Sequence, residues 1–232
     1  GSNNTAIGYQ SLEQNETGGN NTAVGQGALY KNTAALNTAV GGCALICQTT
    51  GGCNTALGYQ AMFKNCDGIK NVAIGAQVMC AGSGGDYNTA VGYQANRCLT
   101  TGTTNSVFGY QTMYKNTTGC QNVALGSSSL YNNLTGNCLV AVGNKALCSN
   151  THESYSTAVG YEALMTAVDA IDNVAVGFRA LCKTTANYNT ALGSSALRNT
   201  TTGCYNMAIG YQTLFNNTEG CQNTAVGERA LY

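Results

Sequence analysis

The chain has 232 residues, with ten Lys and Arg against ten Asp and Glu, 9% charged residues, 30 Gly, no Pro and no Trp. Its balanced and scattered charge does not support attraction to nucleic acid or to an anionic membrane. No apolar stretch approaches the roughly 18 residues that a membrane-spanning helix needs, so membrane insertion is not expected.

One pattern returns along the whole chain: Asn-Thr-Ala-aliphatic-Gly-x-x-Ala-Leu-aromatic, as in residues 21–30. Its glycine recurs every 17 residues, apart from two steps of 16, and marks fourteen copies. These glycines are Gly8, Gly25, Gly41, Gly58, Gly75, Gly92, Gly109, Gly126, Gly143, Gly160, Gly177, Gly193, Gly210 and Gly227. Such a period is typical of a solenoid. We expect an all-β parallel β-roll or β-solenoid of about 14 coils, as a single domain over residues 1–232 and a fragment of a longer chain.

Columns of the repeat are counted here from its glycine as position 0. Position −1 is aliphatic, as in Ile7, and position +4 is mostly Leu or Met, as in Leu12, so we expect these two columns to form the core. Position −2 is Ala in every copy but one, which indicates two backbone layers in close approach. The residues on either side of the glycine predict two short strands in each coil, separated by a bend.

Asn occupies position −4 in twelve of the copies, and Leu139 and Ser156 replace it in the other two. Stacked Asn side chains can hydrogen-bond from coil to coil, either to one another or to turn backbone. We therefore interpret the column as a structural ladder rather than a ligand site. Its members are Asn4, Asn21, Asn37, Asn54, Asn71, Asn88, Asn105, Asn122, Asn173, Asn189, Asn206 and Asn223.

Position −3 is half-apolar, because several members interrupt its threonines: Val72, Val123, Val140, Val174 and Met207. If the Ala and aliphatic columns already serve the coil's own core, this face needs another cover. A thin two-layer roll cannot bury both sides of a strand alone, so another copy of the chain is the natural cover. We expect a homotrimer, with another parallel oligomer as the alternative.

The motif Asn-Thr-Ala-Val-Gly-Tyr-Gln-Ala at residues 88–95, and its variant over residues 206–220, resemble the repeat shafts of phage-type tail-fibre proteins. Such arrays often precede an intramolecular chaperone of the endosialidase type. Residues 105–109, Asn-Ser-Val-Phe-Gly, are more distantly similar to the left-handed β-roll head of trimeric autotransporter adhesins. The resemblance implies a trimeric extracellular or virion fibre that holds or forms an attachment surface, with self-association and a cell-surface glycan or receptor as partners.

Twelve cysteines fit an oxidising compartment better than a cytosolic one. Stacked coils about 4.8 Å apart bring residues of one column within the disulfide range. The candidate pairs in phase or nearly in phase are Cys47 with Cys66, Cys80 with Cys98, Cys120 with Cys138, and Cys204 with Cys221. Free thiols are the alternative; a metal site is disfavoured because the chain has no Cys-x-x-Cys and a single His152.

No residue set looks catalytic, and a solenoid enzyme would need acidic residues clustered in adjacent coils, which the sequence does not show. We expect no enzyme activity and no cofactor. The fourteen tyrosines fall in three columns, and stacking along the sheet is preferred over an aromatic surface for glycans. The most irregular copies give the candidate contact region: Leu139, His152, Ser156 and Ile171.

One alternative function, of a different class from the fibre module, also fits a repeat of this kind. A monomeric, disulfide-stabilised solenoid that binds ice or another surface would also use stacked threonines. It would need a flat and uninterrupted Thr array, whereas Val and Met break the main Thr column of this chain.

Overall fold

The computed structural model describes residues 1–232, which form fourteen strands of three residues each and no helix. Accordingly, it contains no helix that could cross a membrane. The chain divides into two compact units, Gly1–Cys120 and Gln121–Tyr232. The first holds β1 (Thr5–Ile7), β2 (Thr22–Val24), β3 (Thr38–Val40), β4 (Thr55–Leu57), β5 (Val72–Ile74), β6 (Thr89–Val91) and β7 (Ser106–Phe108). The second holds β8 (Val123–Leu125), β9 (Val140–Val142), β10 (Thr157–Val159), β11 (Val174–Val176), β12 (Thr190–Leu192), β13 (Met207–Ile209) and β14 (Thr224–Val226).

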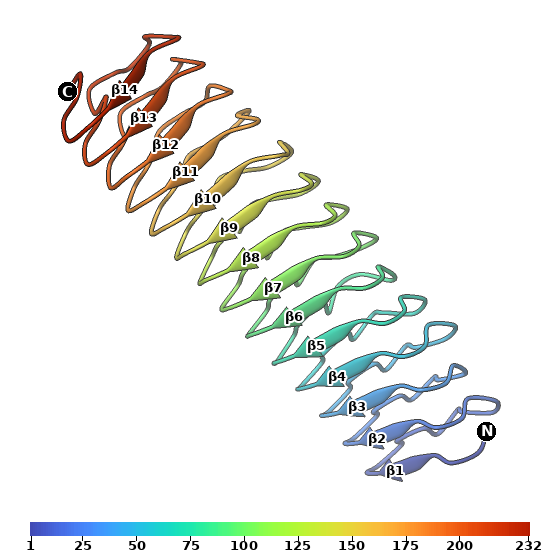
Figure 1. The fold of residues 1–232 in the computed structure, drawn as a ribbon. Coiled ribbons are helices and arrows are strands. Elements are labelled where there is room, and N and C mark those ends of the chain that lie inside the picture. Colours follow the sequence, from blue (N-terminus) through green and yellow to red (C-terminus); the bar gives the residue numbers. More distant parts are fainter. The chain divides into compact units, whose positions relative to one another are not determined.

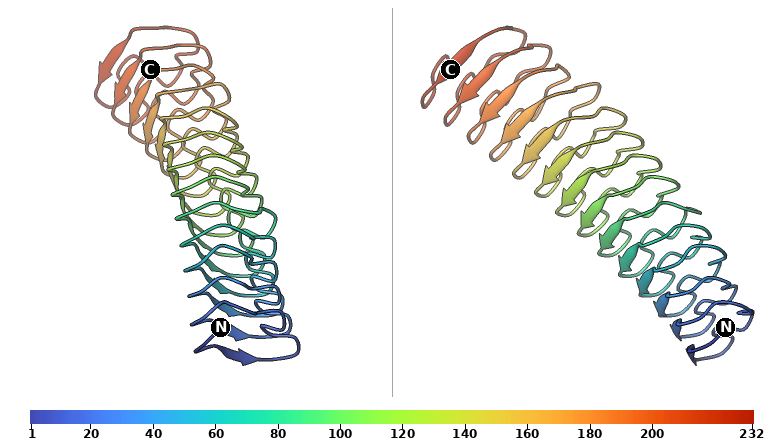
Figure 2. Two further views of the ribbon diagram at one scale, coloured as in Figure 1. Left: turned by 90° about the vertical axis from the view of Figure 1, so that its right-hand side faces the viewer. Right: turned by 45° about the vertical axis from the view of Figure 1, so that its right-hand side comes forward.

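Within each unit, every strand pairs in parallel with the next strand along the chain (Figure 1). The register places equivalent columns side by side, so that Ala23 pairs with Ala39 and Ala39 with Ala56. Figure 2 shows that the connecting loops stack in the same order within each unit. The prediction of an all-β parallel solenoid with a coil of about 17 residues is confirmed.

Each coil has one strand, so the expectation of a second strand after the glycine is wrong. The residues after the glycine form turns, because positions +2 and +4 take the left-handed conformation, as in Gln60 (φ 54°) and Met62 (φ 52°). Position −5, just before the Asn column, does the same, as in Lys70 (φ 55°). Left-handed residues interrupt the extended backbone that a strand requires. The chain thereby reverses within a few residues and closes a narrow coil.

The three residues of each strand alternate between the inside and the outside of the coil, as successive strand side chains must. The central residue, position −2, points inward and is buried in every strand from Ala23 to Ala225. Positions −3 and −1 point outward, so the expectation that position −1 belongs to the core is wrong: Leu57 is 45% exposed and Leu192 is 46% exposed. With only three strand residues, the inside has room for one of them.

The core therefore consists of the Ala column at position −2, the small residues at position +3 and the Leu or Met column at position +4. Leu29, Leu45 and Leu181 are fully buried members of the last column. Each buried side chain of this size stabilises the fold by about 1.5–3 kcal/mol relative to exposure. The expectation for position +4 is confirmed, and Asn96, its one polar member, is also fully buried.

The repeat glycines are required by both conformation and space. Gly58 has φ +136° and Gly193 has φ +141°, in the region that a Cβ disfavours. A Cβ on Gly58 would lie 2.6 Å from the carbonyl carbon of Gly75, the same position in the next coil. The backbones of successive coils therefore touch at this column, which leaves no room for a side chain except at Gly227 in the last coil, where nothing lies within 4 Å.

Candidate functional site

The surface with the clearest chemical character is the outer sheet face, defined here as the outward residues at positions −3 and −1 of the strands. Its −1 column is aliphatic in all strands but β7, which carries Phe108. Several members are well exposed, including Leu125 at 49%. Other members, such as Val91 and Val159, are half-buried. The face is therefore an apolar stripe in each unit.

The −3 column of this face differs between the two units. In residues 1–120 six of the seven strands carry a hydroxyl residue there: Thr5, Thr22, Thr38, Thr55, Thr89 and Ser106. In residues 121–232 four of the seven carry an apolar residue: Val123, Val140, Val174 and Met207. The outer sheet face is thus amphiphilic in the first unit and mainly aliphatic in the second.

Aromatic rings line the turns beside the sheet. Tyr93 and Tyr110, at position +1 of successive coils, stack with ring centroids 5.8 Å apart and planes 14° apart. Tyr161 with Phe178, Tyr188 with Tyr205, and Phe215 with Tyr232 stack in the same way. Each stacked ring covers one face of its neighbour, so these pairs fit the coil-to-coil stacking expected from the sequence.

The neighbouring column at position +2 forms a side-chain ladder in residues 1–120. The amide nitrogen of Gln77 donates to the amide oxygen of Gln60 at 3.2 Å, Gln94 donates to Gln77 at 2.8 Å, and Gln111 donates to Gln94 at 2.8 Å. In residues 121–232 the same column is charged in four of its seven members. Arg179 Nε donates to Glu162 Oε2 at 2.6 Å, and the Glu162 side chain is only 10% exposed.

The Asn column at position −4 lies in the interior and links coil to coil through the backbone. Asn88 Nδ2 donates to the carbonyl of Gly102 at 2.9 Å, and Asn88 Oδ1 accepts from the backbone N–H of Asn105 at 3.0 Å. Asn189 makes the equivalent bonds in the second unit, to Gly203 at 2.9 Å and from Asn206 at 2.9 Å. These side chains therefore satisfy polar backbone groups that the narrow coil buries.

A second interior polar column, at position +7 in the loop, escaped the sequence reasoning. Asn32, Asn116 and Asn133 are fully buried. Each donates from Nδ2 to a loop carbonyl two or three residues later, as Asn133 does to Gly136 at 3.2 Å. The sequence does show this column, because Asn, Gln or Thr recurs at position +7 in most copies. The pattern was missed because Gly82, Leu99 and Ala167 interrupt it.

The candidate contact region does not form one surface. Leu139 and Ser156 are buried, with 0% and 1% exposure, because they occupy the interior ladder column, so proposing them as contact residues was wrong. His152 is at the surface, with its Nδ1 2.9 Å from the hydroxyl oxygen of Thr135. Ile171 is half-buried and its N–H donates to Asn187 Oδ1 at 2.8 Å.

The cysteines are free thiols in the structure. Cys204 and Cys221 have their sulfur atoms 3.0 Å apart. Cys47 neighbours Cys66, where burial first and then the Cys47 thiol raise the pKa of Cys66. Cys98 likewise neighbours Cys80, a buried thiol whose pKa is raised mainly by that burial. The fourth candidate pair draws Cys120 from one unit and Cys138 from the other.

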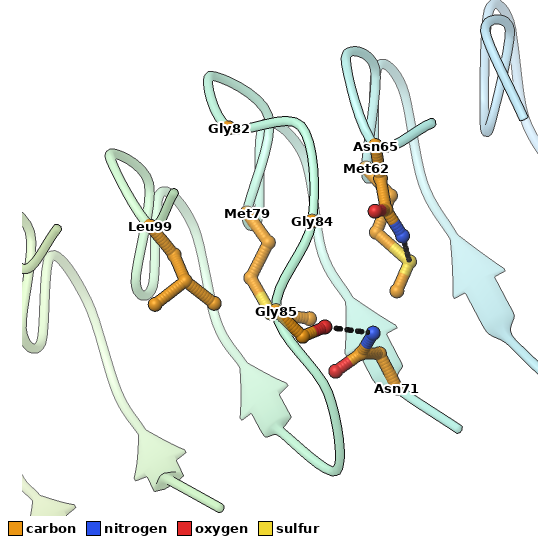
Figure 3. Close-up of a pocket in the computed structure, with 8 residues that line it drawn as sticks. All are labelled: Met62, Asn65, Asn71, Met79, Gly82, Gly84, Gly85 and Leu99. Atoms are coloured by element: carbon orange, nitrogen blue, oxygen red, sulfur yellow. Dashed lines mark hydrogen bonds between the residues drawn. The ribbon is translucent and has the colours of Figure 1, made fainter. Parts of the chain in front are cut away.

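One small cavity lies within residues 1–120. A cavity of about 10 Å³ lies among the loops that follow β4, β5 and β6, lined by Met62, Asn65, Asn71, Met79, Gly82, Gly84, Gly85 and Leu99 (Figure 3). Gly82 stands where the adjacent loops carry Asn65 and Leu99, so a side chain is missing at that point. Such a volume holds about one water molecule and no organic substrate.

A wider, open hollow of about 390 Å³ lies beside it, lined by Asp67, Gly68, Ser83, Gly84, Gly85, Asp86, Thr101 and Thr103. Its two carboxylates come from adjacent loops, a pairing that the sequence reasoning did not find because they occupy different columns. Asp67 Oδ1 accepts from the Thr50 hydroxyl at 2.8 Å, and Asp86 Oδ1 accepts from the N–H of Ile69 at 2.9 Å. Both carboxylates therefore hold loops together. No group of three or more His, Cys, Asp or Glu residues could hold a metal ion.

Comparison of the chain with protein-family models, with curated proteins and with solved structures gives no match. The feature that calls for an explanation is the outer sheet face, and the aromatic turns lie beside it.

Proposed function

We propose that this chain is a shaft and attachment module of an extracellular or virion fibre, in which parallel copies assemble as a homotrimer through the outer sheet face. The observation that carries the proposal is the aliphatic stripe of residues 121–232, which one chain leaves exposed. Large contiguous apolar patches on a protein surface mark interaction sites. A second copy fits because its stripe has the same coil spacing.

The apolar area of the outer sheet face is comparable in free energy to the cost of such an assembly. Seven strands with two outward residues each present fourteen side chains in the second unit. Thr157, Thr190 and Thr224 are polar, so eleven of the fourteen are apolar. At roughly 1 kcal/mol for each apolar side chain that becomes buried, the face contributes on the order of 10 kcal/mol per copy. Association costs about 4–15 kcal/mol in lost freedom, so the stripe is of the right size to hold copies together.

The cysteine content and the exposed tyrosines also support an extracellular fibre. Twelve cysteines favour an extracellular location, where thiols can be kept as disulfides. Exposed rings at the turns, such as Tyr59, Tyr110 and Tyr211, would remain outside a trimer built on the sheet face. Tyrosine combines apolar area with a hydroxyl, which suits contact with a glycan or receptor on a cell surface.

Light scattering on the purified chain tests the proposal directly. We expect a molar mass near three times 23.9 kDa that persists on dilution into the low micromolar range. Measurement with and without reductant separates assembly through the sheet face from disulfides between chains. A monomer at all concentrations would refute the trimeric fibre.

Residues 1–120 favour one alternative function. Their outward hydroxyl column is interrupted only by Val72, and it runs beside an aliphatic column. A regular array of hydroxyl and methyl groups suits a monomeric solenoid that binds ice or another ordered surface. A monomeric mass together with thermal hysteresis, abolished by Thr55→Lys with Thr89→Lys, would favour this function over the fibre.

A further inference from the structure

Two thiols meet at the surface of residues 121–232. Cys204 and Cys221 both occupy position −6, in the loops that lead to β13 and β14, and their sulfur atoms are 3.0 Å apart. Cys221 is exposed and Cys204 is half-buried. From this geometry we propose that the two residues form a redox-active dithiol that closes to an inter-coil disulfide by exchange with a small-molecule disulfide, with Cys221 as the attacking thiol.

The pairing of the strands positions the two cysteines for this reaction. β13 and β14 pair in register, Met207 with Thr224, and the cysteines stand three residues before these partners. Adjacent coils are about 4.8 Å apart, which lies inside the range of roughly 4.4–6.8 Å between the Cα atoms of a disulfide. Bringing the sulfurs from 3.0 Å to a bond of about 2.05 Å needs only a small side-chain rotation.

Cys221 Sγ has one backbone donor and one backbone acceptor beside it, the second being the carbonyl of Glu219 at 3.5 Å, and the backbone donor favours its thiolate. The backbone N–H of Cys204 donates to Cys221 Sγ at 3.1 Å. Other residues of this column accept the same bond, such as Ser154 Oγ from the N–H of Asn137 at 2.9 Å. The position is thus built to receive a hydrogen bond, and a hydrogen-bond donor stabilises a negatively charged sulfur.

The ionisation of the two thiols follows from this arrangement. The hydrogen bond shared by the two thiols, in which either sulfur can donate, lowers the pKa of Cys221, and the hydrogen bond from the Cys204 N–H lowers it further. The same thiol–thiol bond raises the pKa of Cys204. Since the thiolate is the nucleophile in disulfide exchange, Cys221 attacks and Cys204 resolves.

The reaction balances with a small disulfide such as glutathione disulfide as the oxidant. The Cys221 thiolate attacks one sulfur of the oxidant, whose sulfur–sulfur bond breaks, and the released small thiolate takes up a proton. Cys204 then loses its proton to water and attacks Cys221 Sγ in the mixed disulfide, which expels the second small thiolate. Two protein thiols lose two electrons in total, and one small disulfide becomes two small thiols.

The product would clamp two adjacent coils. In a solenoid each coil contacts only its neighbours, so coils can open one after another. A covalent link between the loops before β13 and β14 removes that freedom at one place. This site does not depend on the proposed trimer, because both cysteines belong to one chain.

Trapping and mass spectrometry on the whole chain test the proposal. The reduced protein is incubated with glutathione disulfide, quenched with acid, alkylated and digested. We expect a cross-linked peptide containing Cys204 and Cys221 to form at least tenfold faster than the glutathione adduct of Cys53, an exposed cysteine of the same chain. Equal rates at the three residues, or two freely alkylated cysteines at positions 204 and 221, would overturn the dithiol.

Two variants assign the roles of the cysteines. In Cys204→Ser the mixed disulfide on Cys221 should accumulate, because the resolving thiol is gone. In Cys221→Ser the adduct on Cys204 should form at least tenfold more slowly than the adduct on Cys221 forms in the other variant. The reverse order would overturn Cys221 as the attacking thiol. Ser at this position is compatible with the fold, as Ser154 shows.

Discussion

Residues 1–120 and residues 121–232 share one interior and differ in their outward chemistry. Both stack Ala at position −2, Leu or Met at position +4 and Asn at position −4. On the outer sheet face the first unit carries hydroxyl residues where the second carries mainly Val and Met at position −3. At position +2 a Gln ladder in the first unit corresponds to the Arg179–Glu162 ion pair in the second. The interior specifies the coil, and the outside is free to specify a function.

The largest loss of stability is expected from substitution of a repeat glycine, and it should be similar in the two units. Gly58→Ala in the first unit and Gly193→Ala in the second should each lower the free energy of unfolding by about 3 kcal/mol or more. The new Cβ would lie 2.6 Å from the carbonyl carbon of Gly75 or of Gly210. Denaturant unfolding followed by circular dichroism measures the loss.

Gly227→Ala is the matched control for this prediction. It keeps a positive φ of +124°, but its Cβ meets nothing within 4 Å. It should therefore show only the cost of backbone strain, about 1–2 kcal/mol. A loss as large as that of Gly193→Ala would show that close approach of the coils is not the cause.

The interior Asn ladder should give the next largest effect, again in both units. Asn88→Ala and Asn189→Ala each leave a buried carbonyl and a buried N–H without their partner. An unsatisfied buried group costs about 1–3 kcal/mol, so we expect a loss of roughly 2–4 kcal/mol by chemical denaturation. The exposed Asn216→Ala should change stability by less than about 0.5 kcal/mol. Equal effects of all three would contradict the ladder.

The outer sheet face should separate the two units. Val174→Thr with Met207→Thr makes the second unit resemble the first, and should weaken self-association about tenfold or more, at roughly 1 kcal/mol for each apolar group lost. Sedimentation velocity over a dilution series measures the shift. Thr55→Val with Thr89→Val in the first unit is the reciprocal change and should not weaken association. If the second-unit variant associates as tightly as the original chain, its aliphatic stripe is not the interface.

The smallest effect concerns the ion pair of the second unit. Burial alone would raise the pKa of Glu162, but the hydrogen bonds from Arg179 and Tyr161, together with the charges of Arg179 and Lys145, outweigh burial and hold the pKa below the ordinary value of 4.5. The pair therefore stabilises the fold above about pH 4.5, and this contribution is lost as the pH falls through the folded-state pKa. Glu162→Gln should lower stability slightly at pH 7, because Arg179 is partly exposed, and the difference from the original chain should shrink as the pH falls toward 3.

Thermal unfolding of the two proteins at pH 7 and pH 3 checks this prediction. Gln94→Ala, which breaks the Gln ladder of the first unit without removing charge, should give a difference that does not change with pH. A pH-independent difference for Glu162→Gln would show that the ion pair contributes nothing.

The repeat length, the parallel pairing and the Asn column were readable from the sequence because each recurs at a fixed spacing. The direction of position −1 was not, because aliphatic residues before a glycine fit either side of a strand. Its direction follows from the strand being only three residues long with Ala in the middle. The single strand per coil was hidden for a related reason. Leu at position +4 favours a strand by composition, yet it adopts a left-handed turn, as Leu45 does with φ 49°.

The proximity of Asp67 to Asp86 could not be predicted, since it depends on the irregular loop of residues 81–86. The sulfur contact of Cys204 with Cys221 was predictable in kind, because the residues share a column, but the hydrogen bond that distinguishes Cys221 from Cys204 was not. Backbone pairing follows from periodicity, whereas the asymmetry between two equivalent side chains requires their actual geometry.

The two 16-residue steps show that a coil tolerates a change in the length of its loop. Residues 25–41 and 177–193 span one residue fewer, yet Thr22 still pairs with Thr38 and Val174 with Thr190, so the loop absorbs the deletion. Any coil then offers its neighbours the same interface. Recombination between copies within the gene could remove or duplicate one whole coil without disturbing the packing of the others. Each such event would change the length of a unit by about 4.8 Å. The length of a unit can therefore evolve in steps of one coil.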